Sequence, residues 1–240
     1  MTFLRTEIKY RLSAEVFRVL NREFEAHLEK DNFHFEKIHN IYYDNDSDEV
    51  IRRSLEKPVF KEKLRLRTYE FEGKLFNYVF SEMKNKFDGI GYKRRIKLPL
   101  SAARRLLSGA DPAEILGDGQ IARETLHFIK KTSSYPKLYL SYDRRAYRGK
   151  KECKDQQDLR ITFDSNIVSR ADKLDFCVLP KDKPLLNGGE YILEVKTAYG
   201  YPKWLTEILT EHKVYSTAFS KYGRIWVKGI TNDNLEEIHV

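Results

Sequence analysis

Four cations alternate with other residues in the segment Lys61–Tyr69, KEKLRLRTY. If this segment is a β-strand, its side chains point alternately to two faces, so Lys61, Lys63, Arg65 and Arg67 share one face. Like charges that lie close together on a sheet repel one another, and a solvated face usually mixes signs. A row of one sign therefore favours an anionic ligand, with a charged, solvent-facing strand as the alternative.

The same arrangement recurs in other segments whose residues alternate with a period of two. Cations fall in phase within most of these segments, and a few acids join them, namely Glu7, Glu82 and Glu194. A solvent-facing sheet surface explains any single row of cations. If the sheet is closed, however, several such rows line its lumen, where unpaired cations carry a large desolvation cost. A bound polyanion would offset that cost. The segments that we predict as strands are 3–12, 37–43, 61–69, 76–86, 90–98, 137–147, 159–164 and 191–197.

Amphipathic helices are expected to cover this sheet. Ser13 is a good N-cap for one of them, and another is predicted over 202–211. A short helical segment, VIRRSLEK, is stopped by Pro58. Residues 100–135 read as a small helical insert. These elements predict an α+β fold in a single domain over residues 1–240.

The charge balance points to an anionic partner, because Lys plus Arg total 44 against 36 Asp plus Glu, a formal net charge of +8. The sequence contains no GxGxxG loop, no GxxxxGK[ST] loop, no HExxH and no Cys/His cluster. Rossmann, P-loop and zinc mechanisms therefore have no support. An anion would have to be bound by side chains.

The two cysteines, Cys153 and Cys177, form neither a metal-ligand spacing nor a disulfide framework, which predicts a reducing compartment. No apolar run approaches the roughly 18–20 residues of a membrane helix, and the opening FLRTEIKYRL is not a signal peptide. We therefore expect a soluble, cytoplasmic protein with no membrane segment in this chain, and leave open a separate membrane partner. Nucleic acid is not an expected partner, because the sequence has no recognised reading motif.

Eight short motifs in one order carry a resemblance to a known family. The chain resembles the catalytic domain of the vacuolar transporter chaperone (VTC) family, the polyphosphate polymerase module of the triphosphate tunnel metalloenzyme (CYTH-like) superfamily. The motifs are E-x-K-Y at 7–10, IYYDN at 41–45 with IRRSLEKP downstream, K-x-R-L-R at 63–67, SEMKNK at 81–86, YDRRAY at 142–147, LRITFD at 159–164, LEVK at 193–196 and FSKYG at 219–223.

This resemblance implies an antiparallel β-barrel that forms a tunnel lined by basic residues. It also implies a set of catalytic side chains that contact phosphate: Lys9, Arg65, Arg67, Lys84, Arg144, Arg160 and Lys221. A divalent ion, Mn²⁺ or Mg²⁺, would be bound by Glu194, with Glu7 as the second candidate ligand. Further substrate contacts are expected from Arg52, Lys63, Lys93, Glu82 and Lys196.

One departure from the superfamily pattern bears on the reaction. The superfamily commonly opens with E-x-E-x-K, and Arg5 stands where the first Glu would fall. Hydrolytic members tend to carry more carboxylates for two metals and an attacking water, whereas the predicted lumen rows of this chain contain few acids. The chain is therefore more similar to the polymerase branch.

The resemblance predicts an ATP-dependent polyphosphate polymerase, a metal-dependent phosphotransferase whose partners are ATP and polyphosphate. An acceptor phosphate already presents an anionic oxygen, so the reaction needs alignment and charge stabilisation rather than a general base. Two alternatives stay open: a tripolyphosphate or nucleoside triphosphate hydrolase of the same fold, and a non-catalytic polyphosphate-binding module.

Overall fold

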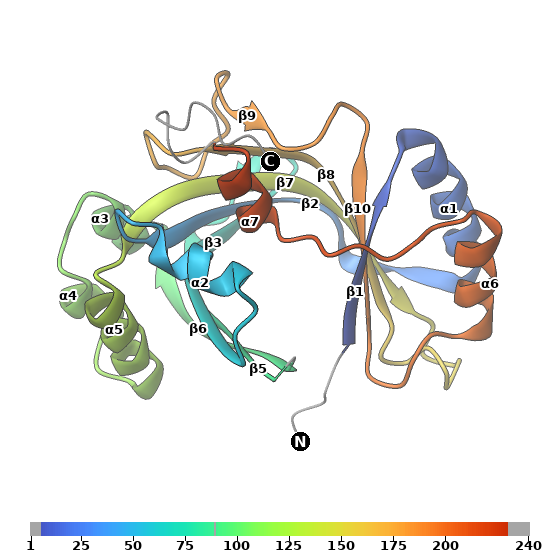
Figure 1. Cartoon of the computed structure of the whole chain (residues 1–240), viewed down its shortest axis with the longest axis horizontal. Coiled ribbons are helices and arrows are strands. Elements are labelled where there is room, and N and C mark those ends of the chain that lie inside the picture. The colour runs from blue at the N-terminus through green and yellow to red at the C-terminus, as the bar shows by residue number, and fades with distance from the viewer. Residues whose placement is uncertain (1–5, 89, 230–240) are drawn as a thin grey trace. The chain divides into compact units, whose positions relative to one another are not determined.

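The computed structural model describes residues 6–88 and 90–229, which form ten β-strands and seven α-helices (Figure 1). The strands are β1 (Thr6–Leu12), β2 (Leu28–Asp44), β3 (Phe60–Phe71), β4 (Lys74–Leu75), β5 (Tyr78–Phe87), β6 (Ile90–Pro99), β7 (Tyr135–Gly149), β8 (Arg160–Arg170), β9 (Lys183–Pro184) and β10 (Tyr191–Thr197). The helices are α1 (Ala14–His27), α2 (Glu49–Leu55), α3 (Leu100–Leu107), α4 (Pro112–Leu116), α5 (Gln120–Thr132), α6 (Lys203–Glu211) and α7 (Lys221–Val227).

All ten strands belong to one sheet with the order β1-β10-β8-β7-β2-β3-β5-β6, to which β4 adds beside β3 and β9 beside β8. The pairs β1/β10, β10/β8, β3/β5 and β5/β6 are antiparallel. The predicted α+β class and antiparallel sheet are thus confirmed. The strand order ends at β1 and β6, so within the described residues the sheet is not closed into the full barrel that we expected.

The chain divides into two compact units. Of the described residues, the first comprises 6–37, 142–167 and 186–219, and the second comprises 38–88, 90–141, 168–185 and 220–229. Strands β2, β7 and β8 each contribute residues to both units. That residues 1–240 form a single domain stays a prediction.

In the first unit, α1 and α6 cover one face of strands β1, β10 and β8 (Figure 1). Ser13 caps α1 as predicted, because its hydroxyl accepts a hydrogen bond from the Val16 amide at 3.2 Å. Leu193 and Val195 of β10 are fully buried in this core. Because strand side chains alternate, Glu194 and Lys196 lie on the opposite face of β10.

In the second unit, the helices of the predicted insert, α3 to α5, pack as one group on strands β3, β5 and β6 (Figure 1). Leu64 and Leu66 of β3 and Met83 of β5 are buried in this core. Alternation again leaves the charged residues of these strands on the other face.

Two strands run well beyond their predicted bounds. Strand β2 begins at Leu28 rather than at residue 37, and its early part exposes Phe33 and Phe35, so apolar alternation did not reveal it. Strand β8 continues to Arg170. Residues 3–5 of the first predicted strand lie outside the described residues.

Helix α7 was not predicted, because KYGRIWV is short and contains a glycine. Its N-cap is Ser220, whose hydroxyl accepts from the Gly223 amide at 3.2 Å. A Cβ at Gly223 would lie only 2.8 Å from Leu55 Cδ2, so glycine permits the close approach to α2. Among all helices of the described ranges, none combines the length and apolar character of a membrane span.

Candidate functional site

Each unit carries a polar cluster on one face of its strands, opposite the face covered by α1 and α6 in the first unit and by α3 to α5 in the second. The β3 cluster, in the second unit, consists of Asn40 and Tyr42 of β2, Lys63, Arg65 and Arg67 of β3, Glu82 and Lys84 of β5, and Lys93 of β6. The β10 cluster, in the first unit, consists of Glu7 and Lys9 of β1, Glu194 and Lys196 of β10, Arg160, Thr162 and Asp164 of β8, and Arg144 of β7.

Glu82 is the centre of the β3 cluster and is fully buried. Its Oε2 accepts from Arg65 Nη2 at 2.8 Å and from Arg65 Nε at 3.0 Å, while Lys93 Nζ lies 3.2 Å from Oε1. Burial alone would raise the pKa of Glu82, but Arg65, Arg67 and Lys93 together lower that pKa to about 2. Glu82, which we predicted as a substrate contact, is therefore an ionised carboxylate that contacts the cations around it.

Strand β2 holds the same two arginines from the other side. Arg67 Nε donates to Asn40 Oδ1 at 2.8 Å, and Arg65 Nη1 donates to the Tyr42 hydroxyl at 3.1 Å. The Asn40 amide also donates to the carbonyl of Leu140 at 3.1 Å, which fixes its orientation. We did not predict Asn40 or Tyr42, although their two-residue spacing in NIYYDN is the signal that they share a face.

The register of the strands places further cations beside this group. Lys63 lies opposite Lys84, and Lys84 lies opposite Lys93. Like-charged cross-strand neighbours repel. Within the β3 cluster five cations accompany a single carboxylate, Glu82, and this excess positive charge suits an anion with several charges.

The β10 cluster is more nearly balanced. Glu7 pairs with Lys196 across the β1/β10 ladder, and Lys9 pairs with Glu194. Lys196 Nζ lies 2.5 Å from Glu194 Oε1 and 3.5 Å from Glu7 Oε2, and Lys9 Nζ lies 3.0 Å from Glu7 Oε1. Two carboxylates and two lysines thus alternate on one face.

Arg144 and Arg160 have acidic partners that we did not predict. Arg144 makes two parallel hydrogen bonds to Asp164, Nε to Oδ1 at 2.6 Å and Nη2 to Oδ2 at 2.8 Å. Burial would lower the pKa of Arg144, but the Asp164 carboxylate holds it well above its usual value, so the guanidinium is charged. Arg160 Nη2 lies 3.2 Å from Asp31 Oδ2. Both arginines are oriented by these carboxylates.

The predicted metal ligands, Glu194 and Glu7, both lie in the β10 cluster. No group of three or more His, Cys, Asp or Glu in the described part of the chain is arranged to hold a metal by protein ligands alone. Mg²⁺ in phosphate-binding enzymes commonly uses only one or two carboxylates and completes its shell with substrate oxygens and water. Glu194 and Glu7, which share Lys196, fit that second type of site.

Two predicted residues lie on helices. Arg52 is on the exposed side of α2, and within the described ranges its side chain forms no hydrogen bond or ion pair with the β3 cluster. Lys221 is the first residue of α7, next to Tyr222, whose ring centroid lies 5.0 Å from that of Tyr42. The roles predicted for Arg52 and Lys221 stay predictions, as do those of the clustered residues.

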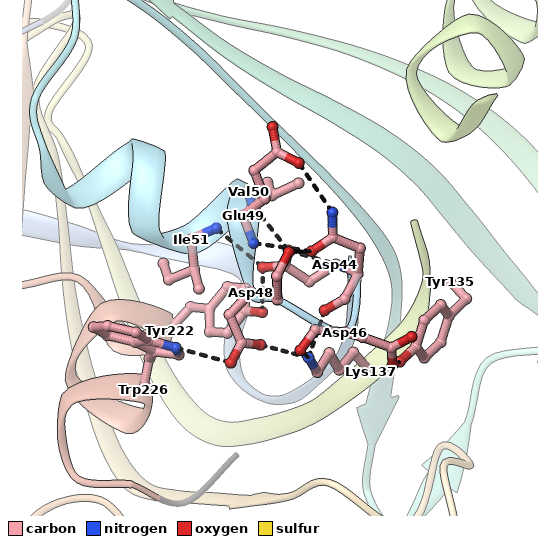
Figure 2. A network of polar contacts seen from close by, with 12 residues as sticks. Asp44, Asp46, Asp48, Glu49, Val50, Ile51, Tyr135, Lys137, Tyr222 and Trp226 are labelled. Atoms are coloured by element: carbon pink, nitrogen blue, oxygen red, sulfur yellow. Dashed lines mark hydrogen bonds and ion pairs between the residues drawn. The ribbon is translucent and has the colours of Figure 1, made fainter. Parts of the chain in front are cut away.

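A network at the end of β2 positions these two helices (Figure 2). The Asp44 carboxylate accepts from the amides of Val50 at 2.9 Å and Ile51 at 3.0 Å in α2, and from the Tyr222 hydroxyl at 2.7 Å in α7. Asp48 accepts from Trp226 Nε1 at 3.0 Å. The IYYDN and FSKYG motifs therefore meet in space.

Asp48 also forms an ion pair with Lys137 of β7, with 2.6 Å between Nζ and Oδ1 (Figure 2). Asp44 and Asp48 thus have structural partners, and we assign them to the architecture of the site rather than to ligand binding.

Comparison with known proteins agrees with the motifs. The family model described as the VTC domain matches residues 4–226. This chain belongs to the VTC-domain family. No curated protein sequence matches this VTC domain.

The chain is also similar to solved structures. A protein from Bacillus halodurans, provisionally assigned as an adenylate cyclase, is 16% identical, with 90% of this chain and 94% of that chain covered and a TM-score of 0.55. A protein from Pyrococcus horikoshii is 16% identical, covering 93% and 98% with a TM-score of 0.49. Another provisional adenylate cyclase, from Vibrio parahaemolyticus, is 10% identical, covering 94% and 99% with a TM-score of 0.46. The fold assignment rests on the first of these.

The VTC domain therefore has the α+β fold of the triphosphate tunnel superfamily. Family and fold together support a role in handling triphosphates or polyphosphate.

Proposed function

We propose that this VTC domain is a polyphosphate polymerase that transfers the γ-phosphoryl group of ATP to a growing polyphosphate chain in the presence of Mn²⁺ or Mg²⁺. The observation that carries the proposal is the fixed orientation of Arg65 and Arg67, which Glu82, Asn40 and Tyr42 hold in a cluster with excess positive charge. Arginines oriented before the substrate arrives can stabilise phosphate charge without reorganising during the reaction.

Phosphoryl transfer asks a protein mainly for alignment and charge stabilisation. Arg65 and Arg67 supply planar groups that can bind phosphate in a forked geometry, whereas Lys63, Lys84 and Lys93 act as point charges. These cations would stabilise the charge that builds on the oxygens of the transferred group. On this assignment, activity should be sensitive to replacement of the Arg65 guanidinium by another group of the same charge.

The nucleophile would be a terminal phosphate oxygen of the acceptor chain. That oxygen forms a bond to the γ-phosphorus, the bond from the γ-phosphorus to the β–γ bridging oxygen breaks, and ADP leaves with the electron pair. Because the attacking oxygen is already an anion, no general base is required. His39 has structural partners instead: its ring nitrogens lie 2.8 Å from the Tyr139 hydroxyl and 3.1 Å from Glu70 Oε2.

A divalent ion fits the donors of the β10 cluster, where Glu194 with Glu7 would hold it jointly with phosphate oxygens. When bound, such an ion neutralises phosphate charge and favours displacement of the leaving group. Lys196 and Lys9 lie beside these carboxylates.

The proposal is tested by product analysis of the purified chain with ATP and each metal in turn. The polymerase reaction gives ADP together with acid-stable polymer. Orthophosphate that accumulates without polymer would favour the hydrolase alternative. Saturable polyphosphate binding with no ADP release under either metal would favour the non-catalytic binding module.

A further inference from the structure

The Tyr42 hydroxyl has a hydrogen-bond donor that the proposed mechanism does not use. Its side chain is half-buried on the face of β2 that carries the β3 cluster, and its hydroxyl oxygen accepts from Arg65 Nη1 at 3.1 Å. In residues 6–88 and 90–229 the O–H proton of Tyr42 has no acceptor. A phenol can both donate and accept, so this hydroxyl has an unused donor beside a cationic site.

The groups around Tyr42 are mostly cations. Arg65 and Arg67 face it from β3, and Lys84 faces it from β5. Burial would raise the pKa of Tyr42, but these three charges lower it to about 7. The phenol therefore ionises within the range of pH in which proteins are ordinarily studied.

Helix α7 packs against the same ring but does not share this behaviour. The Tyr222 ring lies 5.0 Å from that of Tyr42, and its hydroxyl donates to Asp44 at 2.7 Å. Burial, followed by the charge of Asp44, raises the pKa of Tyr222. Asp44 itself is bonded to backbone amides of α2, so Tyr42 is the tyrosine of this pair that can exchange a proton.

We propose that Tyr42 is a further phosphate-binding residue. When a triphosphate binds, Arg65 Nη1 donates to a phosphate oxygen in place of the Tyr42 oxygen, and the Tyr42 hydroxyl itself donates a hydrogen bond to a phosphate oxygen. This inference rests on the proposed function of the β3 cluster. The arriving phosphate adds negative charge next to the phenolate, so the phenolate takes one proton from bulk solvent. No other covalent bond changes in this step.

The sign of the pH dependence follows. Above pH 7 the Tyr42 phenolate competes with phosphate for Arg65, and binding must take up a proton. At pH 8, one unit above the pKa of about 7, the uptake due to Tyr42 is about 0.9 proton when the bound ligand restores an ordinary tyrosine pKa. The affinity for triphosphate then falls by up to about tenfold per pH unit above 7, until the pH reaches the pKa of the bound state.

The experiment is calorimetric titration of tripolyphosphate at pH 8 in buffers of different ionisation enthalpy, which yields the number of protons taken up. Three proteins are compared: wild type, Tyr42→Phe and Tyr43→Phe. Phe keeps the ring that packs on Tyr222, and Tyr43 is the matched control because it points to the opposite, apolar face of β2. Wild type and Y43F are expected to take up about 0.9 proton more than Y42F. The ionisation of tripolyphosphate contributes equally to all three.

Equal proton uptake by wild type and Y42F, with binding intact, would overturn the role of Tyr42 and leave the proposed function standing. Failure of all three proteins to bind tripolyphosphate would overturn the proposed function and the role of Tyr42 with it. A second measurement needs no variant: phenolate absorbance of wild type should titrate with a midpoint near pH 7, and saturating tripolyphosphate should suppress that step. A wild-type titration with no phenolate step below about pH 9 would also overturn the inference.

Discussion

Arg65 of β3 lies directly opposite Glu82 of β5 and places two nitrogens, Nη2 and Nε, within 3.0 Å of one carboxylate oxygen. The two residues are neighbours across the ladder, so the strand register itself produces the contact. The remaining guanidinium nitrogen, Nη1, is turned to Tyr42. The orientation of Arg65 is thus set by two strands at once.

Replacing Glu82 with Gln should destabilise the fold, because Arg65, Arg67 and Lys93 would then face one another without their shared anion. Removing one partner of a buried ion pair costs about 3–5 kcal/mol, and the partial exposure of Lys93 reduces this to about 2–3 kcal/mol here. Urea unfolding of E82Q measures the loss. Glu62→Gln, on the other face of β3, is the matched control and should stay within about 0.5 kcal/mol of wild type. Equal stability of E82Q and wild type would contradict the central place of Glu82.

The same pair predicts a dependence on acid. The pKa of Glu82 is about 2 in the folded protein against 4.5 as its ordinary value, so its stabilisation is fully present above pH 4.5 and is lost as the pH falls towards 2. The difference in free energy of unfolding between wild type and E82Q should therefore be constant near neutral pH and shrink below pH 4.5. Unfolding curves at a series of pH values measure this, and a difference that grows in acid would be inconsistent with the assigned charges.

Arg65→Lys keeps the charge but removes the forked group that contacts Glu82 and Tyr42 together. We expect kcat for polymer synthesis to fall by about 100- to 1,000-fold, since loss of one oriented donor to the reacting group has effects of this order. Arg94→Lys is the control, because Arg94 lies on the helix-covered face and pairs with Glu124. An R65K enzyme as active as R94K would mean that Arg65 supplies charge alone.

Glu194→Gln tests the proposed metal ligand. Loss of its charge should abolish stimulation by Mn²⁺ and Mg²⁺, while binding of tripolyphosphate without metal should persist or strengthen, because a negative charge has been removed beside Lys9 and Lys196. Metal titration of activity and calorimetry of tripolyphosphate give the two readouts. Glu190→Gln, just before β10 and paired with Arg11, is the control. Unchanged metal stimulation in E194Q would assign the metal elsewhere.

The faces of single strands could be predicted from the sequence, because alternation is a local property. KEKLRLRTY separates Lys63, Arg65 and Arg67 from Leu64 and Leu66, and the structure buries both leucines in the core as this requires. The eight ordered motifs predicted the family and the α+β fold for the same reason: each motif is contiguous in the sequence.

The partners of those residues could not be predicted, because they depend on which strands become neighbours. Asn40 and Tyr42 reach the arginines only because β2 lies beside β3, and Asp164 meets Arg144 only because β7 lies beside β8. Helix α7 is likewise stabilised by contacts that are distant in sequence, from Tyr222 to Asp44 and from Trp226 to Asp48. Local propensity contains no signal for such pairs.

The most direct test of the central claim is to follow the label of [γ-³²P]ATP during incubation with the purified chain and Mn²⁺ or Mg²⁺. The account predicts that label enters a polymer that lengthens with time, that one ADP appears for each phosphate incorporated, and that an exopolyphosphatase releases the label as orthophosphate. Label found only in ATP, or only in orthophosphate formed without any polymer, would contradict it.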